Sequence, residues 1–186
     1  MLKKIMRMWL LVSFALLSLG LSAQVATPKV LLVVAQIAET NSMDPGTVTA
    51  VNDFQILINV YDGLVRYRSG TLDVETGLAE SWTISDDGKV YTFSLRQGIK
   101  FHDGSPFNAK AVRFNFDRML VKDHPYAETG PFPLSFFFSV IKETTVVDEY
   151  IVCFSIDDPY APLLSNLAYP TGLIISSEAF KKQARM

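Results

Sequence analysis

Cysteine and histidine are scarce in this sequence, which has one cysteine, Cys153, and two histidines, His102 and His124, among 186 residues. A single cysteine cannot form an internal disulfide, so the fold must be stabilised by its core. Zinc and nickel sites usually need three or four clustered ligands, which these residues do not supply. We therefore expect no metal site and no cofactor, and Cys153 fits a small core side chain better than a reactive thiol.

An excess of basic residues is also absent. The chain has 17 Lys and Arg against 19 Asp and Glu, a formal net charge of −2. Residues 1–23 hold three of the basic residues and none of the acidic ones, so the remainder carries a net charge of −5. This balance argues against nucleic acid as a partner.

Long apolar runs are confined to the N-terminus. Three basic residues precede an apolar run over 8–21, and small residues follow it, which is typical of a cleavable secretory signal peptide over 1–23. A membrane-spanning helix needs roughly 20 apolar residues, and this run reaches Gln24 too soon. A lipoprotein leader would place a cysteine at the cleavage point, where none stands. We therefore expect a periplasmic protein without a lipid anchor.

The segment after this leader has the pattern of an α/β element. The apolar run Val30–Ile37 predicts a strand buried on both faces, and the turn formers over 39–46 predict a loop. A helix is predicted over 51–60 because apolar side chains recur there at helical spacing: Phe54, Leu57 and Ile58. Asn52 or Asp53 could cap its start.

Two antiparallel hairpins are the clearest local signals. Residues 82–95 contain Asp87-Gly88 between alternating apolar runs, a strong hairpin sign, and residues 145–156 repeat the pattern around Asp148-Glu149. One face of each hairpin should be buried, through Tyr91, Phe93, Leu95, Tyr150, Val152, Phe154 and Ile156.

A helix is expected between the hairpins, capped by Asn108 and packed on them through one apolar stripe: Val112, Phe116, Met119 and Leu120. Three prolines and a glycine over 124–133 suit a surface loop. For Phe136–Phe138, burial is favoured over an exposed partner surface. Ser176 or Ser177 could cap a final helix that runs through Phe180.

The sequence contains little that resembles a catalytic motif. His102-Asp103 could suggest a base with an orienting carboxylate, but neighbours on a strand point apart and no nucleophile motif accompanies them, so turn roles are favoured. The loop after the first strand lies where ligands bind in α/β folds. From this position alone, Asn41, Ser42 and Asp44 are the candidate ligand-binding residues.

A dense series of motifs carries a resemblance. It runs through Gly77–Trp82, Asp86-Asp87-Gly88, Tyr91–Arg96 and Gly98–Phe107. Further matching segments lie before and after it, at Met43–Pro45, Tyr61–Tyr67, Asn108–Val112 and Asp148–Pro162. This series resembles the signature of the peptide, opine and nickel family (family 5) of ABC-transporter solute-binding proteins. Its residues are turn formers and apolar side chains, which indicates scaffold roles. The scaffold positions are Trp82, Gly88, Tyr91, Phe93, Gly98, Phe101, Asp103 and Gly104.

The resemblance implies a mixed α/β and α+β fold like type II periplasmic binding proteins, in which two lobes close on a solute. Residues 24–65 would begin lobe I, 66–169 would form an additional antiparallel lobe, and 170–186 would return toward lobe I. It also implies a monomer that delivers a peptide or other small solute to an inner-membrane ABC permease. Nickel chelates, opines, sugars and haem stay open as ligands.

Two further expectations follow. Family members would complete lobe I and build the opposing lobe beyond this length, so we expect solute binding to be impaired by truncation. The alternatives from other classes are a standalone periplasmic interaction module that displays Phe136–Phe138, and a periplasmic hydrolase, for which the nucleophile, base and oxyanion donors cannot be assembled.

Overall fold

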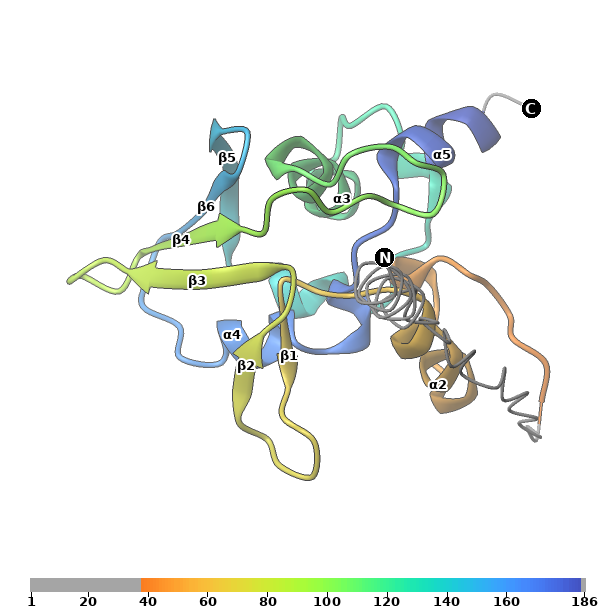
Figure 1. The fold of residues 1–186 in the computed structure, drawn as a ribbon, viewed down its shortest axis with the longest axis horizontal. Coiled ribbons are helices and arrows are strands. Elements are labelled where there is room, and N and C mark those ends of the chain that lie inside the picture. The colour runs from red at the N-terminus through yellow and green to blue at the C-terminus, as the bar shows by residue number, and fades with distance from the viewer. Residues whose placement is uncertain (1–37, 185–186) are drawn as a thin grey trace, which may run out of the picture. The chain divides into compact units, whose positions relative to one another are not determined.

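A four-stranded antiparallel sheet organises the described part of the chain, residues 38–184 of a computed structural model (Figure 1). The predicted signal peptide and the strand predicted over Val30–Ile37 lie outside the described residues. The strands follow the order β3 (Ala79–Ile84), β4 (Val90–Leu95), β6 (Ile151–Ile156) and β5 (Ile141–Asp148). Both predicted hairpins are thereby confirmed, as β3–β4 and β5–β6, and β4 pairs with β6 to join them.

One face of this sheet is buried and the other is not. Tyr91, Phe93 and Leu95 of β4 are buried, as are Val152 and Phe154 of β6, in the alternation that the sequence predicts. Gly88 turns the first hairpin at φ +71°, a left-handed conformation that glycine adopts without steric cost. The pattern of alternate residues therefore sets which face meets the core.

Helix α3 (Ala109–Leu120) covers the buried face, as predicted. Its N-cap is Asn108, whose side chain accepts a hydrogen bond from the Ala111 N–H at 3.1 Å. Val112 and Phe116 are fully buried, and the Phe116 ring lies 4.8 Å from that of Phe154, centroid to centroid. This packing joins the helix to the centre of the sheet.

Helix α2 (Val51–Val60) has the predicted bounds but not the predicted cap. Its N-cap is Ala50, and no side chain caps it. Asp53 lies in the first turn, where its buried carboxylate accepts hydrogen bonds from Asn41 instead. Ile58 is 56% exposed, because the helix buries the side that carries Phe54 and Leu57.

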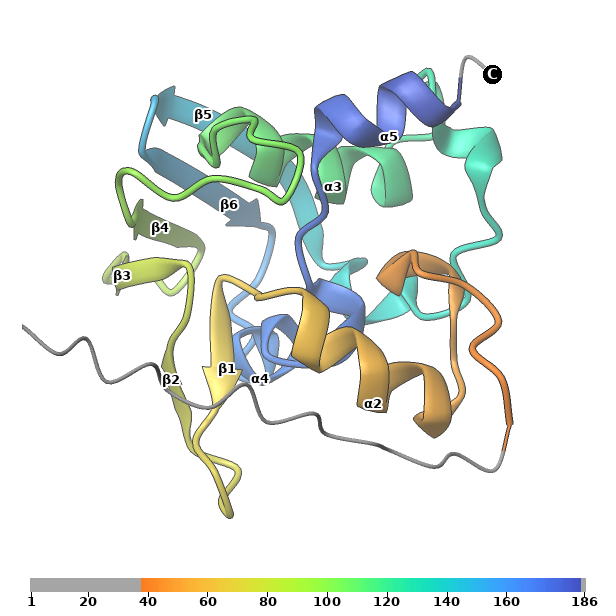
Figure 2. The ribbon, with the colours of Figure 1, turned by 45° about the vertical axis from the view of Figure 1, so that its right-hand side comes forward.

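The remaining elements link the beginning of the described chain to its end. They are β1 (Val65–Tyr67), β2 (Val74–Thr76), α4 (Leu163–Leu167) and α5 (Ser177–Gln183). Gly63 forms an isolated antiparallel bridge with Leu173, and the Ile174 N–H donates to the Asp62 carbonyl at 2.9 Å. Figure 2 shows α5 beside α3. No helix within residues 38–184 has both the length and the hydropathy needed to cross a membrane.

The Phe136–Phe138 run is buried only in part, so the expectation of burial is wrong for its first residue. Phe138 is fully buried, whereas Phe136 is 58% exposed. The three residues belong to a 3₁₀ turn, Ser135–Phe138, in which successive side chains point in directions about 120° apart. Such a turn cannot bury all three rings on one side.

Candidate functional site

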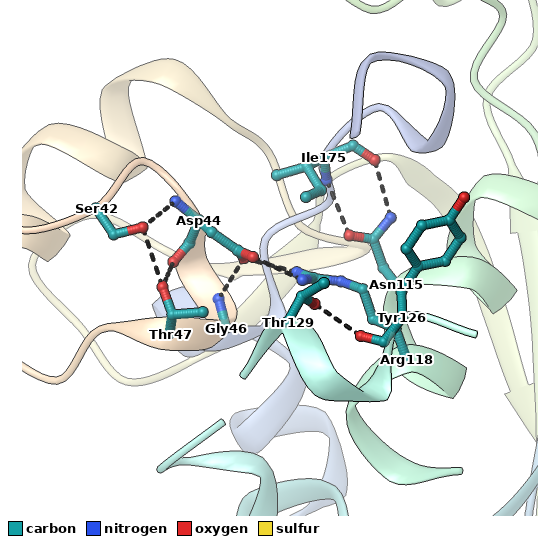
Figure 3. A network of polar contacts seen from close by, with 9 residues as sticks. All are labelled: Ser42, Asp44, Gly46, Thr47, Asn115, Arg118, Tyr126, Thr129 and Ile175. Atoms are coloured by element: carbon teal, nitrogen blue, oxygen red, sulfur yellow. Dashed lines mark hydrogen bonds and ion pairs between the residues drawn. The ribbon is translucent and has the colours of Figure 1, made fainter. Parts of the chain in front are cut away.

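A polar side of α3 holds two segments that are far apart in the sequence. Asn115 and Arg118 are one turn apart and share this side. The Asn115 amide, 1% exposed, donates to the Ile175 carbonyl at 2.9 Å and accepts from the Ile175 N–H at 3.1 Å. This pair of hydrogen bonds fixes the chain just before α5 against the helix (Figure 3).

Arg118 binds the other segment, the loop that contains Asp44, through a bidentate ion pair with the Asp44 carboxylate. Nη1 and Nη2 of Arg118 each lie 2.6 Å from one carboxylate oxygen of Asp44. The Arg118 side chain is 2% exposed and that of Asp44 16%. The Phe132 and Phe180 rings lie 5.2 and 4.9 Å from the guanidinium carbon. Bidentate geometry and aromatic faces suit a buried arginine, and within the described residues only its Nε lacks a hydrogen-bond partner.

The loop around Asp44 is held by its own hydrogen bonds as well. Asp44 accepts from the Gly46 N–H at 3.0 Å, while the Ser42 hydroxyl accepts from the Asp44 N–H and the Thr47 hydroxyl, both at 3.0 Å. Figure 3 shows the Asp44 carboxylate directed toward Arg118, with Ser42 and Thr47 on the opposite side of Asp44. The position of residues 42–47 is therefore determined by both local and long-range contacts.

A hollow of about 620 Å³ lies beside this loop, within the 300–1,000 Å³ typical of ligand pockets. Its walls come from the loop, the end of α2, the 101–103 segment and α5. The residues with functional groups or rings on it are Ser42, Asp44, Tyr61, Phe101, His102, Asp103, Thr129, Ser176, Phe180 and Gln183. Two carboxylates and neither lysine nor arginine line it within the described part of the chain. The charge of Asp44 is balanced by Arg118, so the acidic character of the hollow comes from Asp103.

Two groups on the hollow have shifted pKa values. A hydrogen bond from the Ser105 hydroxyl at 2.6 Å, with another from Ser176 at 2.8 Å, lowers the pKa of the exposed Asp103 carboxyl. Burial, and then the nearby Asp44 charge, raises the pKa of the Tyr61 phenol. At neutral pH the hollow thus offers a charged acceptor at Asp103 and a protonated phenol at Tyr61, which suits binding of a polar solute.

The predicted ligand-binding residues separate in the structure. Ser42 and Asp44 line the hollow, but Asn41 is not among its lining residues. The Asn41 backbone N–H and side-chain amide instead donate to the Asp53 carboxylate at 2.8 and 3.0 Å. That all three contact a solute stays a prediction.

The scaffold positions fall into two groups. Trp82, Tyr91 and Phe93 pack in the sheet core, and the three glycines, Gly88, Gly98 and Gly104, have positive φ. Phe101 and Asp103, by contrast, lie on the hollow. Asp103 accepts hydrogen bonds from the Ser105 backbone and hydroxyl, so it serves a turn, the role favoured for His102-Asp103.

The largest omission from the sequence-based set is Arg118, together with Asn115 and Tyr61. Ala111, Asn115 and Arg118 recur at the i, i+4, i+7 spacing of one helix side, but a polar side of this kind is expected to face water, so the sequence carries no signal of its burial. Within residues 38–184, no group of three or more His, Cys, Asp or Glu side chains is placed to hold a metal ion.

Comparison with known proteins finds a matching protein family and similar relatives. Residues 73–185 match the family described as bacterial extracellular solute-binding proteins, family 5 Middle. The chain is 36% identical over 166 residues to the probable D,D-dipeptide-binding periplasmic protein DdpA of Escherichia coli (strain K12), covering 87% of this chain and 31% of that one. It is 37% identical over 179 residues to di/tripeptide-binding protein 2 of Pseudomonas aeruginosa (strain UCBPP-PA14), covering 89% of this chain and 34% of that one.

Solved structures agree. The periplasmic binding protein DppA from Helicobacter pylori, in complex with the peptide STSA, superposes with a TM-score of 0.70 at 34% identity, over 80% of this chain and 31% of that one. The chain thus spans about a third of the length of the curated relatives and solved structures it matches. The expected mixed α/β fold of periplasmic binding proteins is confirmed.

The expectation that the protein is not an enzyme is also confirmed, because the family and these relatives are binding proteins. With more than half of its residues matched, the chain belongs to the bacterial extracellular solute-binding proteins, family 5.

Proposed function

We propose that this protein takes part in the periplasmic capture of a peptide for an ABC importer, and that the hollow beside residues 42–44 forms one wall of the solute site. The observation that carries the proposal is the acidic, preformed hollow on a loop fixed by the Arg118–Asp44 ion pair. A wall held in place before binding loses little conformational entropy when the solute arrives, which favours affinity.

The chemistry of the hollow fits one end of a peptide. A free peptide carries an ammonium group at its N-terminus, which an ionised carboxylate such as Asp103 attracts. The Tyr61 phenol and the Ser42 hydroxyl can hydrogen-bond to the backbone of an extended segment. The relatives named above bind dipeptides or tripeptides according to their names, and the Helicobacter pylori structure contains a peptide.

The proposed division of the chain also draws on contacts in the structure. Residues 24–65 would begin lobe I, residues 66–169 would form the additional lobe, and residues 170–186 would return to lobe I. The bridge between Gly63 and Leu173 supports this return, since it pairs the two proposed lobe I segments directly. Asn115 and Arg118 of the additional lobe would then fix both of these segments in place.

Calorimetric titration of the full chain with an unblocked dipeptide, Ala-Ala, tests the proposal. Asp103→Asn should weaken binding by about fivefold, because an exposed ion pair contributes up to ~1 kcal/mol. The matched control is Asp87→Asn, which removes a carboxylate of the same kind: Asp87 is also exposed, accepts from a serine hydroxyl at 2.6 Å and has a lowered pKa. It lies in the β3–β4 turn and should leave affinity unchanged.

Two results would count against a peptide site. Equal losses from Asp103→Asn and Asp87→Asn would mean that only overall charge matters. Heat from a nickel chelate, an opine, a sugar or haem, with none from the dipeptide, would keep a solute site and replace its ligand.

A further inference from the structure

A second hollow, of about 480 Å³, is also lined by a residue of α5, Lys181. Adjacent residues of this helix face different hollows, since Phe180 lines the acidic one and Lys181 lines the second. The Phe180 ring also packs edge-on against the Phe114 and Tyr126 rings, each at 5.7 Å between centroids. Both of these rings line the second hollow, so Phe180 connects two differently built sites.

The floor of the second hollow is aromatic and fixed. The Phe114 side chain is buried, at 8% exposure, and the rings of His124 and Tyr126 each meet it edge-on at 5.6 Å. Val146 of β5 adds an aliphatic surface. Phe114 thereby fixes the positions of the His124 and Tyr126 rings, which are only half buried and, with the exposed Pro125, leave a preformed apolar surface that can accept one inserted side chain.

The rim of the second hollow is basic. Lys110, Arg113 and Lys181 line it against a single acid, Asp117. Arg113 pairs with Asp117 at 2.8 Å, and Lys181 pairs with Glu178 at 3.0 Å while its ammonium group lies 5.2 Å from the Phe114 ring centroid. Lys110 is exposed and takes part in no ion pair with another residue of the described range. The rim therefore keeps positive charge, on a chain whose net charge is −2.

The exposure of the rim to water favours a protein segment over a small molecule as the ligand of the second hollow. A small molecule gains affinity when a pocket buries most of its surface, whereas Lys110 and Arg113 on this rim are exposed to water. A protein segment brings further surface of its own and needs only an anchor side chain with a charge-complementary rim. Nucleic acid does not suit a chain of net negative charge.

We propose that this basic aromatic groove, formed by Lys110, Arg113, Phe114, His124, Tyr126 and Lys181, docks an acidic segment of a partner protein that inserts an aromatic side chain. The inserted ring rests on the half-buried rings of His124 and Tyr126, which Phe114 holds from below, and acidic residues on either side of it face Lys110 and Lys181. This site is separate from the acidic hollow and does not depend on the proposed capture of a solute.

The test uses the full chain and a blocked, fluorescein-labelled peptide, Glu-Glu-Phe-Glu-Glu, followed by fluorescence anisotropy. Lys110→Glu reverses one rim charge and should weaken binding about tenfold, since it replaces an attraction with a repulsion. The control is Lys100→Glu, which makes the same charge change at an exposed lysine outside the groove and should leave binding unchanged. Circular dichroism verifies that both variants fold.

Two further peptides separate charge from shape. Glu-Glu-Ser-Glu-Glu, which lacks the ring, and Lys-Lys-Phe-Lys-Lys, which has the opposite charge, should each bind at least about tenfold more weakly than the first peptide. Equal losses from Lys110→Glu and Lys100→Glu would overturn the proposal, as would equal binding of the serine peptide. Binding to vesicles of anionic lipid, without binding of the acidic peptide, would also overturn it.

Discussion

Helix α3 is packed in two different ways on two of its sides. Toward the sheet it presents Val112 and Phe116, both fully buried among aromatic rings. Toward residues 44 and 175 it presents Arg118 and Asn115, which make directed polar contacts. Apolar burial depends on the area covered and tolerates small shifts, whereas a bidentate ion pair fixes a distance and an angle. The first side therefore supplies stability, and the second sets where the candidate site lies.

The apolar side should give the larger loss when it is broken. Phe116→Ala removes a ring that packs 5.1 Å from Phe138 and 4.8 Å from Phe154, and it should lower the free energy of unfolding by about 3–5 kcal/mol. Urea unfolding followed by circular dichroism measures the loss. The control is Ile58→Ala, at an exposed position of α2, which should change stability by less than about 0.5 kcal/mol. Similar losses from both variants would show that the sheet core is not where stability resides.

The polar side should give a smaller loss but a more local one. Arg118→Met keeps most of the buried stem and leaves the Asp44 carboxylate without its partner, at 16% exposure. We expect a loss of about 3 kcal/mol, near the lower end for breaking a buried ion pair because Asp44 retains some contact with water. Hydrogen exchange at the amides of Gly46 and Thr47 should speed up more than exchange in β4 or β6.

Two companion variants sharpen this result. Arg113→Met breaks another ion pair of α3, the one between Arg113 and Asp117. Because the Arg113 side chain is 53% exposed, the free energy of unfolding should fall by at most about 0.5 kcal/mol. The double variant Asp44→Asn with Arg118→Met should be more stable than Arg118→Met alone, because no unpaired charge is left near the core. If the double variant loses the sum of the two single losses, the two residues are not coupled.

The sequence predicts the apolar side of α3 better than the polar one. Alternating residues of β4 and β6 and the spacing of Val112 and Phe116 are local patterns, and the structure follows them. The partner of Arg118 is 74 residues away, so no local pattern identifies Asp44 as its acceptor. An arginine on a helix is exposed by default, and only the fold shows that this one is buried.

The sequence likewise predicts the candidate site only in part. Position after the first expected strand pointed to Ser42 and Asp44, which do lie on the hollow. The same reasoning included Asn41, whose amide is taken by Asp53 of α2, a contact that composition cannot reveal. Phe180 and the second hollow are not predictable from local patterns, because the residues around them come together only when α5 packs beside α3. Tyr61, at the end of α2, is found only once the fold shows that it lines the first hollow.

The smallest expected effect concerns a third side of α3, the one that carries Phe114. His124 packs on Phe114, and burial lowers the pKa of its imidazole, with smaller opposing and reinforcing effects from Asp117, Arg118 and Lys181. The folded-state pKa therefore lies below the unfolded value of about 6.5. As the pH falls through 6.5, the unfolded chain takes up a proton before the folded one does, so stability falls until the folded pKa is passed.

The melting temperature of the wild-type chain should accordingly drop between pH 7.5 and pH 5.5. His124→Phe retains a ring against Phe114 without a titrating group, and it should lose part of this drop. The lowered carboxyl pKa values of Asp87 and Asp103 affect stability only at more acidic pH, below their ordinary values near 4, so they do not obscure the comparison. An equal drop in both proteins would mean that a group other than His124 responds, and that this side of α3 is open enough to water for its histidine to titrate as it does in the unfolded chain.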